Sequence, residues 1–511
     1  MSCIRKMNMK EKNKIASEFL GNSFYRLIFI FLANIGGALF TIFTARILAP
    51  ERFGIYTLAL SVALMLIAIA EAGFSETLIR FVSLNANNNK KAKSYFVYLL
   101  KIKITILLVL SILLVLFSKL IANFYNNSNL FYPILISALY LFFYSLMQFI
   151  SDLFYAFKNL KAYCLKEFIF QISRIALIFL FAYLAFISSS MPIIATVISI
   201  LITIIFVLIY LKKRYKEFFK SEIQEINRKE LFHYLKYLTI SSFSILLLFY
   251  TDVLILGKFV SPEYIGFYKT ASSIAAFAFS ILVFTTIIYP ILTTASKNKT
   301  KNISNILLYY ISIFAFPITA LLVILSKYFI RLLFGYEYLD AYFPLIVLSF
   351  LVIITPISEY FRVLLNSKGY TKNTAKIITI GSILNVILNL IFIYFFFKFW
   401  GPKMAVLGAA ISTVLSRLYI AIVLISNSKK KFSIYLRRTN VVKPFIASLF
   451  MAFFMFYFTK LIYGRANIWL VSLDLILGIG AYVIVLLAIK GISKKEFRYL
   501  KEAILQARKS I

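Results

Sequence analysis

The chain has 511 residues, of which 62% are hydrophobic and 15% are charged, and its formal net charge is +37. A soluble fold of this length could not bury so much apolar surface, so the composition indicates a protein surrounded mostly by lipid. The basic residues stand in short clusters between apolar runs, as in membrane proteins, and nucleic-acid binding is therefore not expected. Cys3 and Cys164 show no disulfide or metal-site spacing.

A membrane-spanning helix needs about 20 apolar residues. The sequence contains fourteen runs of about this length, and they are too long and too uniformly apolar for the strands of a barrel. The expected helices cover residues 20–45, 55–80, 95–118, 130–157, 167–187, 191–211, 232–257, 264–290, 303–326, 341–365, 376–397, 404–426, 442–462 and 467–489. The expected fold class is an all-α polytopic membrane protein with about 14 transmembrane helices.

Lys and Arg are unevenly distributed among the connectors. The two termini and the connectors after every second run carry about four times as many as the opposite connectors. Because basic connectors stay on the cytoplasmic side, both termini are expected there, in a multi-pass protein of the cell membrane. The longest connector, residues 212–231, mixes Lys with Glu and is expected to form a solvated helix.

Two outer connectors repeat each other. Arg46-Ile-Leu-Ala-Pro-Glu-Arg-Phe-Gly-Ile-Tyr56 returns as Lys258-Phe-Val-Ser-Pro-Glu-Tyr-Ile-Gly-Phe-Tyr268, at an offset of 212 (258 − 46 = 212). Lys161-Ala-Tyr163 and Lys368-Gly-Tyr370 match at an offset of 207 (368 − 161 = 207). Pro-Glu-x-x-Gly alone is ordinary loop chemistry, but two matches nearly in register favour a duplicated chain. The expected domains are an N-terminal six-helix lobe (1–211), a cytoplasmic linker (212–231), a C-terminal six-helix lobe (232–430) and two additional helices with a tail (431–511).

These segments resemble the Wzx-type polysaccharide flippases of the MOP/MATE-like exporter superfamily. Residues 45–56 look like that family's first outer connector, and Glu71-Ala-Gly-Phe74 followed by Arg80 looks like the exit of its second helix. Thr251-Asp252 leading into residues 262–268 looks like the corresponding segment of the second half. The resemblance implies two lobes that are parallel repeats around a central cavity. It also implies ion-coupled alternating access that moves polyprenyl-diphosphate-linked oligosaccharide from the cytoplasmic to the outer leaflet.

The implied partners are a lipid-linked oligosaccharide, membrane lipids and other polysaccharide-assembly proteins, and no cofactor is expected beyond a coupling ion, H⁺ or Na⁺. The outer connectors are short and no nucleotide or metal motif occurs, so catalytic and metal sites are not expected. Two other functions stay open at this stage. One is a related exporter, either a multidrug cation antiporter or a peptidoglycan-precursor flippase, and the other is a membrane enzyme of polysaccharide assembly.

Three arginines within the runs are the candidate substrate-binding cations. At about 1.5 Å per residue, Arg26 and Arg174 lie about 10 Å inside their runs, and Arg417 lies about 14 Å from its cytoplasmic end. Charged groups are costly in hydrocarbon, so they are expected to face a wet cavity, where a guanidinium suits a diphosphate. Each could instead be neutralised by an acid or reach the headgroups.

Three further residues are candidates for ion coupling or gating. Glu71 lies at a depth where it could pair with Arg26. Asp252 and Lys269 lie at equal depth on one hairpin, at about 8–9 Å from the outer surface, and are expected to form a buried ion pair. An unpaired Asp252 would be a candidate site for H⁺ or Na⁺.

Further ionisable residues lie within the runs. Glu359 and Arg362 share a helix face and should pair. Asp152 lies near a cytoplasmic end, and Asp474 lies outside the two lobes, where the sequence does not assign it a role.

Overall fold

The computed structural model describes residues 9–71, 73–283, 289, 292–293, 295–436, 438–462 and 468–491. Within these residues every regular element is a helix, and each expected apolar run overlaps one. Of the helices in this described part, nine are long and apolar enough to cross a membrane, or up to ten if the bent pair Tyr336–Leu348 and Leu351–Ser367 forms one span. The all-α fold class is therefore confirmed, while the count of fourteen spans stays a prediction.

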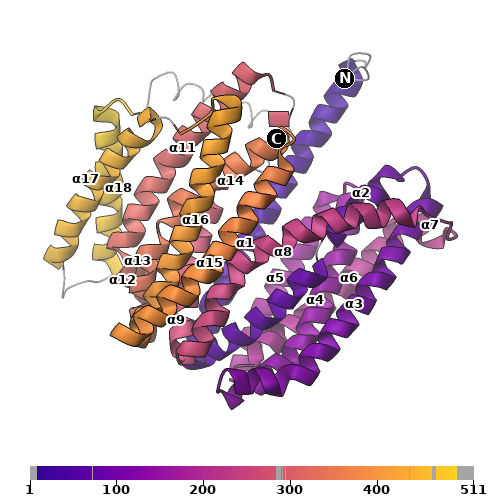
Figure 1. Cartoon of the computed structure of the whole chain (residues 1–511), viewed down its shortest axis with the longest axis horizontal. Helices are drawn as coiled ribbons and strands as arrows, with labels where there is room; N and C mark the ends of the chain where they lie inside the picture. The colour runs from indigo at the N-terminus through magenta and orange to yellow at the C-terminus, as the bar shows by residue number, and fades with distance from the viewer. Residues whose placement is uncertain are drawn as a thin grey trace. The chain divides into compact units, whose positions relative to one another are not determined.

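The helices follow one another along the whole described chain (Figure 1). The earlier ones are α1 (Met9–Glu71), α2 (Phe74–Leu84), α3 (Asn89–Phe124), η2 (Ser128–Leu130), α4 (Phe131–Ala156), α5 (Leu160–Tyr183), α6 (Met191–Arg214), α7 (Lys216–Lys220), α8 (Arg228–Phe259) and α9 (Pro262–Ser280). The later ones are α11 (Lys297–Ile324), α12 (Ser326–Leu333), η3 (Tyr336–Ala341), α13 (Tyr342–Leu348), α14 (Leu351–Ser367), α15 (Thr371–Trp400), α16 (Pro402–Phe432), α17 (Arg438–Ile462) and α18 (Ile468–Ala488).

Proline ends the helix at both copies of the repeated connector. Within α1 the backbone leaves the helical region at Ala49, with φ 60° and ψ 168°, directly before Pro50. Proline lacks an N–H and disfavours a helical residue before it, so the two expected runs are separated at this point. In the second copy α8 ends at Phe259 and α9 begins at Pro262, in the first-turn position that proline prefers.

The structure divides into two compact units. Unit 1 contains residues 1–273, 334–340 and 378–413, and unit 2 contains residues 274–333, 341–377 and 414–511. Unit 1 combines the expected N-terminal lobe with segments of the expected C-terminal lobe, whereas unit 2 holds the rest of the C-terminal lobe and the two additional helices. The lobe boundaries therefore stay a prediction.

Unit 1 is built around an aromatic and aliphatic core. Its helix α3 packs along α4, α5 packs along α6, and α1 packs along α4, α5 and α8. Phe96 and Phe149 stack with their ring centroids 6.1 Å apart, and both are buried with Phe154 and Leu78. Burial of each such side chain contributes about 1.5–3 kcal/mol, which holds the helices in register around the polar groups described below.

Unit 2 is organised around α11. This helix packs against α14 and α17, and α17 packs against α18. Met451, Met455 and Tyr482 form a buried cluster with Ile313, and the Tyr482 hydroxyl donates to the Ile313 carbonyl oxygen at 2.7 Å. The two expected additional helices, α17 and α18, therefore belong to a packed core.

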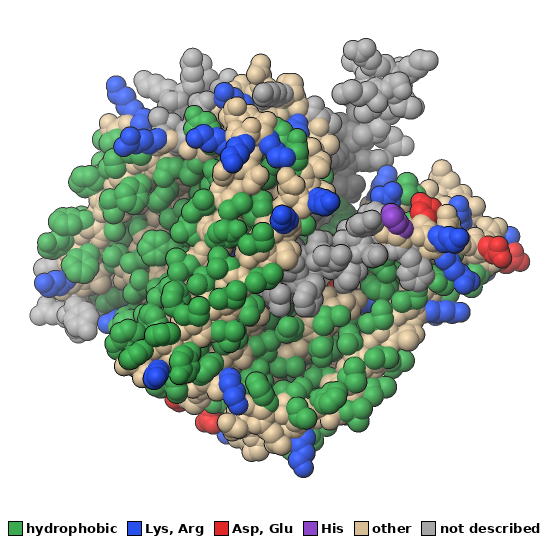
Figure 2. Space-filling model, in the orientation of Figure 1, with side chains coloured by type: hydrophobic (Ala, Val, Ile, Leu, Met, Phe, Trp, Pro, Cys, Tyr) green, Lys and Arg blue, Asp and Glu red, His purple; other side chains and the backbone are tan. Residues whose placement is uncertain are grey.

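The outer surfaces of the helices suit a lipid environment. Leu108, Ile112, Leu116 and Leu120 recur every four residues along α3, and their side chains are between 47% and 70% exposed. Figure 2 shows apolar side chains over the middle of the helices on the visible face and Lys and Arg mostly toward their ends. This distribution is that of a multi-pass membrane protein.

The expected solvated helix over residues 212–231 is wrong. α6 continues to Arg214, α7 is five residues long, and residues 221–227 are not helical. Phe218 of α7 is 2% exposed and packs into the core of unit 1, which fixes the linker against α3. The hydrogen-bonded Lys90 ammonium, 2.7 Å from Glu222, lowers the pKa of that carboxyl.

Candidate functional site

The two repeated connectors pack against each other within unit 1. A Cβ added at Gly54 would lie 1.7 Å from the Pro262 carbonyl oxygen, and one added at Gly266 would lie 2.6 Å from the Pro50 carbonyl oxygen. Pro50 corresponds to Pro262 in the repeat, and Gly54 corresponds to Gly266. Each contact is therefore the counterpart of the other, as across a two-fold axis, and glycine is required because two backbones meet there.

Tyr338 covers this junction. Its hydroxyl donates to the Ala45 carbonyl oxygen at 2.8 Å, and its ring packs edge-on against Phe53 and Phe267, with ring centroids 6.2 Å apart in both pairs. The Tyr338 side chain is 1% exposed. Backbone contact and aromatic packing together close the end of unit 1 that holds both connectors.

A buried ion pair lies at the C-terminal end of helix α1, at Glu71. The Lys103 ammonium lies 3.1 Å from the Glu71 carboxylate and donates to the Ala70 carbonyl oxygen at 2.7 Å. Ser145 donates to the same carboxylate at 2.5 Å. The Lys103 side chain is fully buried and that of Glu71 is 27% exposed. In the part of the chain with described side chains, the partner of Glu71 is thus Lys103; the side chain of the expected partner, Arg26, lies outside that part.

A network of hydrogen-bonded polar side chains runs along α5. The fully buried Lys166 ammonium lies 3.2 Å from the Glu167 carboxylate and donates to Gln148 at 3.1 Å. Gln171 donates to the other Glu167 oxygen at 2.6 Å and accepts a hydrogen bond from Arg174. The positions 167, 171 and 174 are three or four apart, so these side chains share one face of α5.

Arg174 is the last residue of this network, and no carboxylate forms an ion pair with it among the described residues. Its guanidinium lies over the rings of Phe40 and Phe170, at 4.3 and 5.0 Å from their centroids. It has no ion pair among the described residues, and its buried Nε has no hydrogen-bond partner there. α5 begins at Leu160, so Arg174 lies about 21 Å along the helix from its start. Its depth in the membrane stays a prediction.

Among the residues with described side chains, the interior of unit 1 holds the cations Lys103, Lys166 and Arg174 and the acids Glu71, Asp152 and Glu167, in addition to Asp252, which is described below. Asp152 is 7% exposed, and its Oδ2 has no hydrogen-bond partner among the described residues. Ionisable groups in a membrane interior generally mark a substrate or ion path.

Sequence reasoning missed Lys103, Lys166 and Glu167. Lys166 and Glu167 stand at the start of an apolar run, where basic and acidic residues normally reach the headgroups, whereas Lys103 lies eight residues inside the run 95–118. Their helices begin earlier than the runs do, at Asn89 for α3 and at Leu160 for α5. A signal was available in the adjacent opposite charges of Lys166 and Glu167 at the start of the run 167–187.

Asp252 lies in a separate polar cluster, which is formed by side chains of α8, α9, α15 and α16. Its Oδ2 accepts hydrogen bonds from Tyr268 at 2.5 Å and Thr413 at 2.6 Å, and its Oδ1 accepts one from Asn389 at 2.5 Å. Thr251 and Asn389 both donate to Asn385 Oδ1, at 3.0 and 3.2 Å. Asp252 is 4% exposed, and Asn389 Oδ1 is buried without a partner among the described residues.

The expected ion pair between Asp252 and Lys269 is wrong. Both side chains are described, and no contact of 4.0 Å or less joins their charged groups. Asp252 is held by hydroxyl and amide donors because Tyr268, the residue before Lys269, faces it instead. Lys269 lies on a different face of α9 and is half-buried.

The remaining expected residues are placed as follows. Arg26 lies in α1, and its side chain is outside the described part. Arg417 is half-buried in α16 and belongs to unit 2, whereas Arg174 belongs to unit 1, so a common cavity stays a prediction.

Glu359 and Arg362 pair at 2.6 Å, as expected. Asp474 is buried and accepts from Thr459 at 2.7 Å, which joins α18 to α17.

Comparison with known proteins gives a family match. The model of the family described as polysaccharide biosynthesis protein matches residues 43–343. An uncharacterized membrane protein of Methanocaldococcus jannaschii is 24% identical over 422 residues, which are 76% of this chain and 80% of that protein. The probable low-salt glycan biosynthesis flippase Agl15 of Haloferax volcanii is 26% identical over 280 residues, which are 54% of this chain and 57% of that protein.

A solved structure shares the fold. The lipid II flippase MurJ in an inward closed conformation superimposes with a TM-score of 0.71 over 90% of this chain and 97% of that one, at 19% identity. At this identity the likeness concerns the fold, and it confirms the exporter fold that the sequence predicts.

Proposed function

The chain belongs to the polysaccharide biosynthesis protein family, and from this premise we propose that it moves a lipid-linked oligosaccharide from the cytoplasmic to the outer leaflet of the cell membrane. Two similar proteins, the Haloferax relative and the structural neighbour, are flippases by name. In this proposal both termini are cytoplasmic, the protein is a transporter and not an enzyme, and the lipid carrier is a polyprenyl diphosphate.

The observation that carries the proposal is the environment of Arg174. A guanidinium in the interior of a membrane protein is costly unless something compensates it. Two aromatic rings and Gln171 position this one, and no described carboxylate forms an ion pair with it. Its free donors suit a phosphate, because the planar fork keeps its charge when it is desolvated.

Replacement of Arg174 tests this function. We expect Arg174→Gln to slow leaflet transfer of a fluorescent polyprenyl-diphosphate oligosaccharide in proteoliposomes by about tenfold or more, since hydrogen bonds to charged groups contribute about 1.5–3 kcal/mol each. Arg174→Lys keeps the charge but loses the fork, so it should be intermediate. The measurement is the initial rate of transfer at equal amounts of reconstituted protein.

Lys119→Gln is the matched control, because Lys119 is exposed and makes no described ion pair. Transfer by Arg174→Gln at the wild-type rate would remove Arg174 from the substrate path. If the wild type transfers no lipid-linked glycan but exports organic cations, the proposed function is wrong and the antiporter alternative is right.

We further propose that the Asp252 cluster is the coupling site for a monovalent cation, Na⁺ or H⁺. One carboxylate, the amide oxygen of Asn385, the amide nitrogen of Asn389 and three hydroxyls converge there from four helices. A single carboxylate suits a monovalent ion, whereas a calcium site needs six to eight oxygens and commonly several carboxylates. The unpartnered Asn389 Oδ1 supports this proposal, because a buried acceptor without a donor is costly unless an ion or proton engages it.

The coupling proposal predicts that Asp252→Asn abolishes the response of transport to an imposed ion gradient. The substitution conserves shape but removes the charge that the ion would neutralise. Transfer rates should be measured under a Na⁺ gradient and separately under a pH gradient. The gradient that stimulates the wild type about tenfold or more should not stimulate Asp252→Asn. Asp474→Asn serves as the control, since Asp474 is a buried acid outside the cluster. An unchanged response of Asp252→Asn to both gradients contradicts the coupling role.

A further inference from the structure

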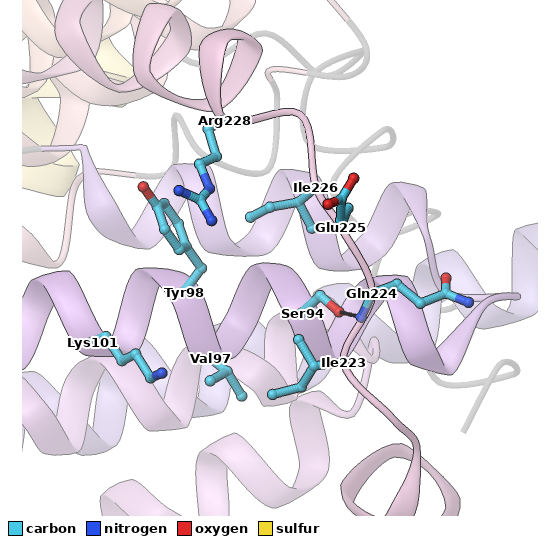
Figure 3. Close-up of a pocket in the computed structure, with 9 residues that line it drawn as sticks. All are labelled: Ser94, Val97, Tyr98, Lys101, Ile223, Gln224, Glu225, Ile226 and Arg228. Atoms are coloured by element: carbon cyan, nitrogen blue, oxygen red, sulfur yellow. Dashed lines mark hydrogen bonds between the residues drawn. The ribbon is translucent and has the colours of Figure 1, made fainter.

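A cavity of about 530 Å³ lies between the linker and α3, away from the polar groups described above. It is lined by Ser94, Val97, Tyr98 and Lys101 of α3, by residues 223–226 of the linker, and by Arg228 at the start of α8. Figure 3 shows Arg228 extending toward Tyr98 from the α8 side, with Lys101 farther along α3. All of these residues belong to unit 1.

The linker is tied to α3 before it reaches this cavity. The Lys93 ammonium donates to the carbonyl oxygens of Phe219 and Ser221, both at 2.6 Å, and the Gln224 N–H donates to Ser94 Oγ at 2.7 Å. Nearer to α8, the Tyr95 hydroxyl of α3 accepts a hydrogen bond from the backbone N–H of Asn227. The cavity is therefore bounded by a backbone segment that is tied to α3 on both sides.

The cavity carries two cations without ion pairs. Lys101 and Arg228 are exposed, and neither lies within 4.0 Å of a carboxylate among the residues with described side chains. The Arg228 guanidinium lies over the Tyr98 ring at 5.2 Å from its centroid, which orients its plane and leaves its edge donors available. Glu225 is the one acid in the lining and is exposed, so the lining has an excess of positive charge.

The geometry points to a binding site for a phosphate group in this cavity, held between the Arg228 fork and the Lys101 ammonium. Phosphate matches an arginine fork and a lysine point charge. The bound phosphate would join α3 to the start of α8 across the linker. The site therefore lies at the connection between the two expected halves, and it does not depend on which substrate is transported.

Two sources could supply this phosphate: the headgroup of an anionic phospholipid or a soluble phosphate compound. Val97, Ile223 and Ile226 line the cavity beside the cations, and Ile223 is 61% exposed. The long apolar face of α3 begins shortly after Lys101, so the cavity lies close to the level of the headgroups. Apolar groups next to cations favour a lipid, whose acyl chains can follow these side chains.

The full-length protein in phosphatidylcholine nanodiscs provides the test. Short-chain phosphatidylglycerol is titrated in one arm and inorganic phosphate in the other, and hydrogen exchange of residues 221–227 is followed. We expect phosphatidylglycerol to slow this exchange and Lys101→Gln/Arg228→Gln to weaken its apparent affinity about tenfold or more. Arg228→Lys should be intermediate, because it keeps the charge without the fork.

Lys91→Gln is the matched control, because Lys91 is an exposed cation on the same helix that does not line the cavity. Equal unfolding midpoints of all variants establish that they fold. Protection by inorganic phosphate as strong as that by the lipid identifies a soluble ligand. The proposal is overturned if neither probe slows the exchange, or if the double variant binds phosphatidylglycerol as tightly as Lys91→Gln does.

Discussion

We expect Gly54→Ala to reduce transport at least tenfold, because it would prevent the two repeated connectors from closing on each other. The added Cβ would lie 1.7 Å from the Pro262 carbonyl oxygen, well inside van der Waals contact. Overpacking typically costs about 1–3 kcal/mol, and here the obstacle is backbone and not a flexible side chain. The closed arrangement should therefore lose population, and a transporter that cannot close one end cannot alternate.

Two measurements check this result together. One is the rate of leaflet transfer, and the other is maleimide labelling of Ala45→Cys in a background where Cys3 and Cys164 are replaced by serine. Ala45 is fully buried at the junction, so its labelling should rise in Gly54→Ala if the connectors separate. Gly266→Ala should have the same effect through Pro50, at 2.6 Å.

Gly480→Ala is the control for the glycine substitutions. A Cβ at Gly480 has no atom within 4 Å among the described residues, and alanine favours its helix α18 by about 1 kcal/mol. Wild-type transport and wild-type labelling in Gly54→Ala would show that the reciprocal contact is not needed for closure.

The largest loss of stability is expected for Lys103→Met. This change removes a fully buried ammonium and leaves Glu71 without its ion-pair partner. Breaking one partner of a buried pair costs about 3–5 kcal/mol, whereas replacing both partners is often nearly neutral. Because Glu71 is 27% exposed, water relieves part of the penalty, and we expect about 3 kcal/mol. Denaturant unfolding in detergent micelles gives the free energy of unfolding.

Lys103→Met/Glu71→Gln separates structure from function. The double variant should recover most of the lost stability, and if it is stable but does not transport, the pair serves the transport path. Arg362→Gln is the matched control, because its pair with Glu359 is local and partly exposed and should contribute less than about 0.5 kcal/mol. A loss in Lys103→Met no larger than in Arg362→Gln would contradict the structural role of the buried pair.

The fold was predictable to the extent that it depends on hydropathy and proline. The apolar runs coincide with helices because a bilayer requires every backbone polar group to be satisfied locally. Pro50 and Pro262 separate consecutive helices because proline cannot continue one. The pair Glu359–Arg362 was also predictable, since its spacing within one helix places both side chains on the same face.

The partners of the buried charges were predicted less well. Equal depth suggested that Asp252 meets Lys269, but the rotation of α9 places Tyr268 toward Asp252 and Lys269 away from it. Asn385, Asn389 and Thr413 join that cluster from more than 130 residues away. Depth along a helix can be read from the sequence, whereas the direction in which a side chain points depends on how the helix is packed.

By itself the sequence determined the membrane class, the helical architecture and the duplication of the connectors, because composition, run length and repeated residues act locally. Only the tertiary structure decided that the duplicated connectors meet reciprocally through Gly54 and Gly266, and that Lys103 pairs with Glu71. These contacts join residues that are distant in the chain, and they form only when packing of the apolar faces has fixed the rotation and the spacing of every helix.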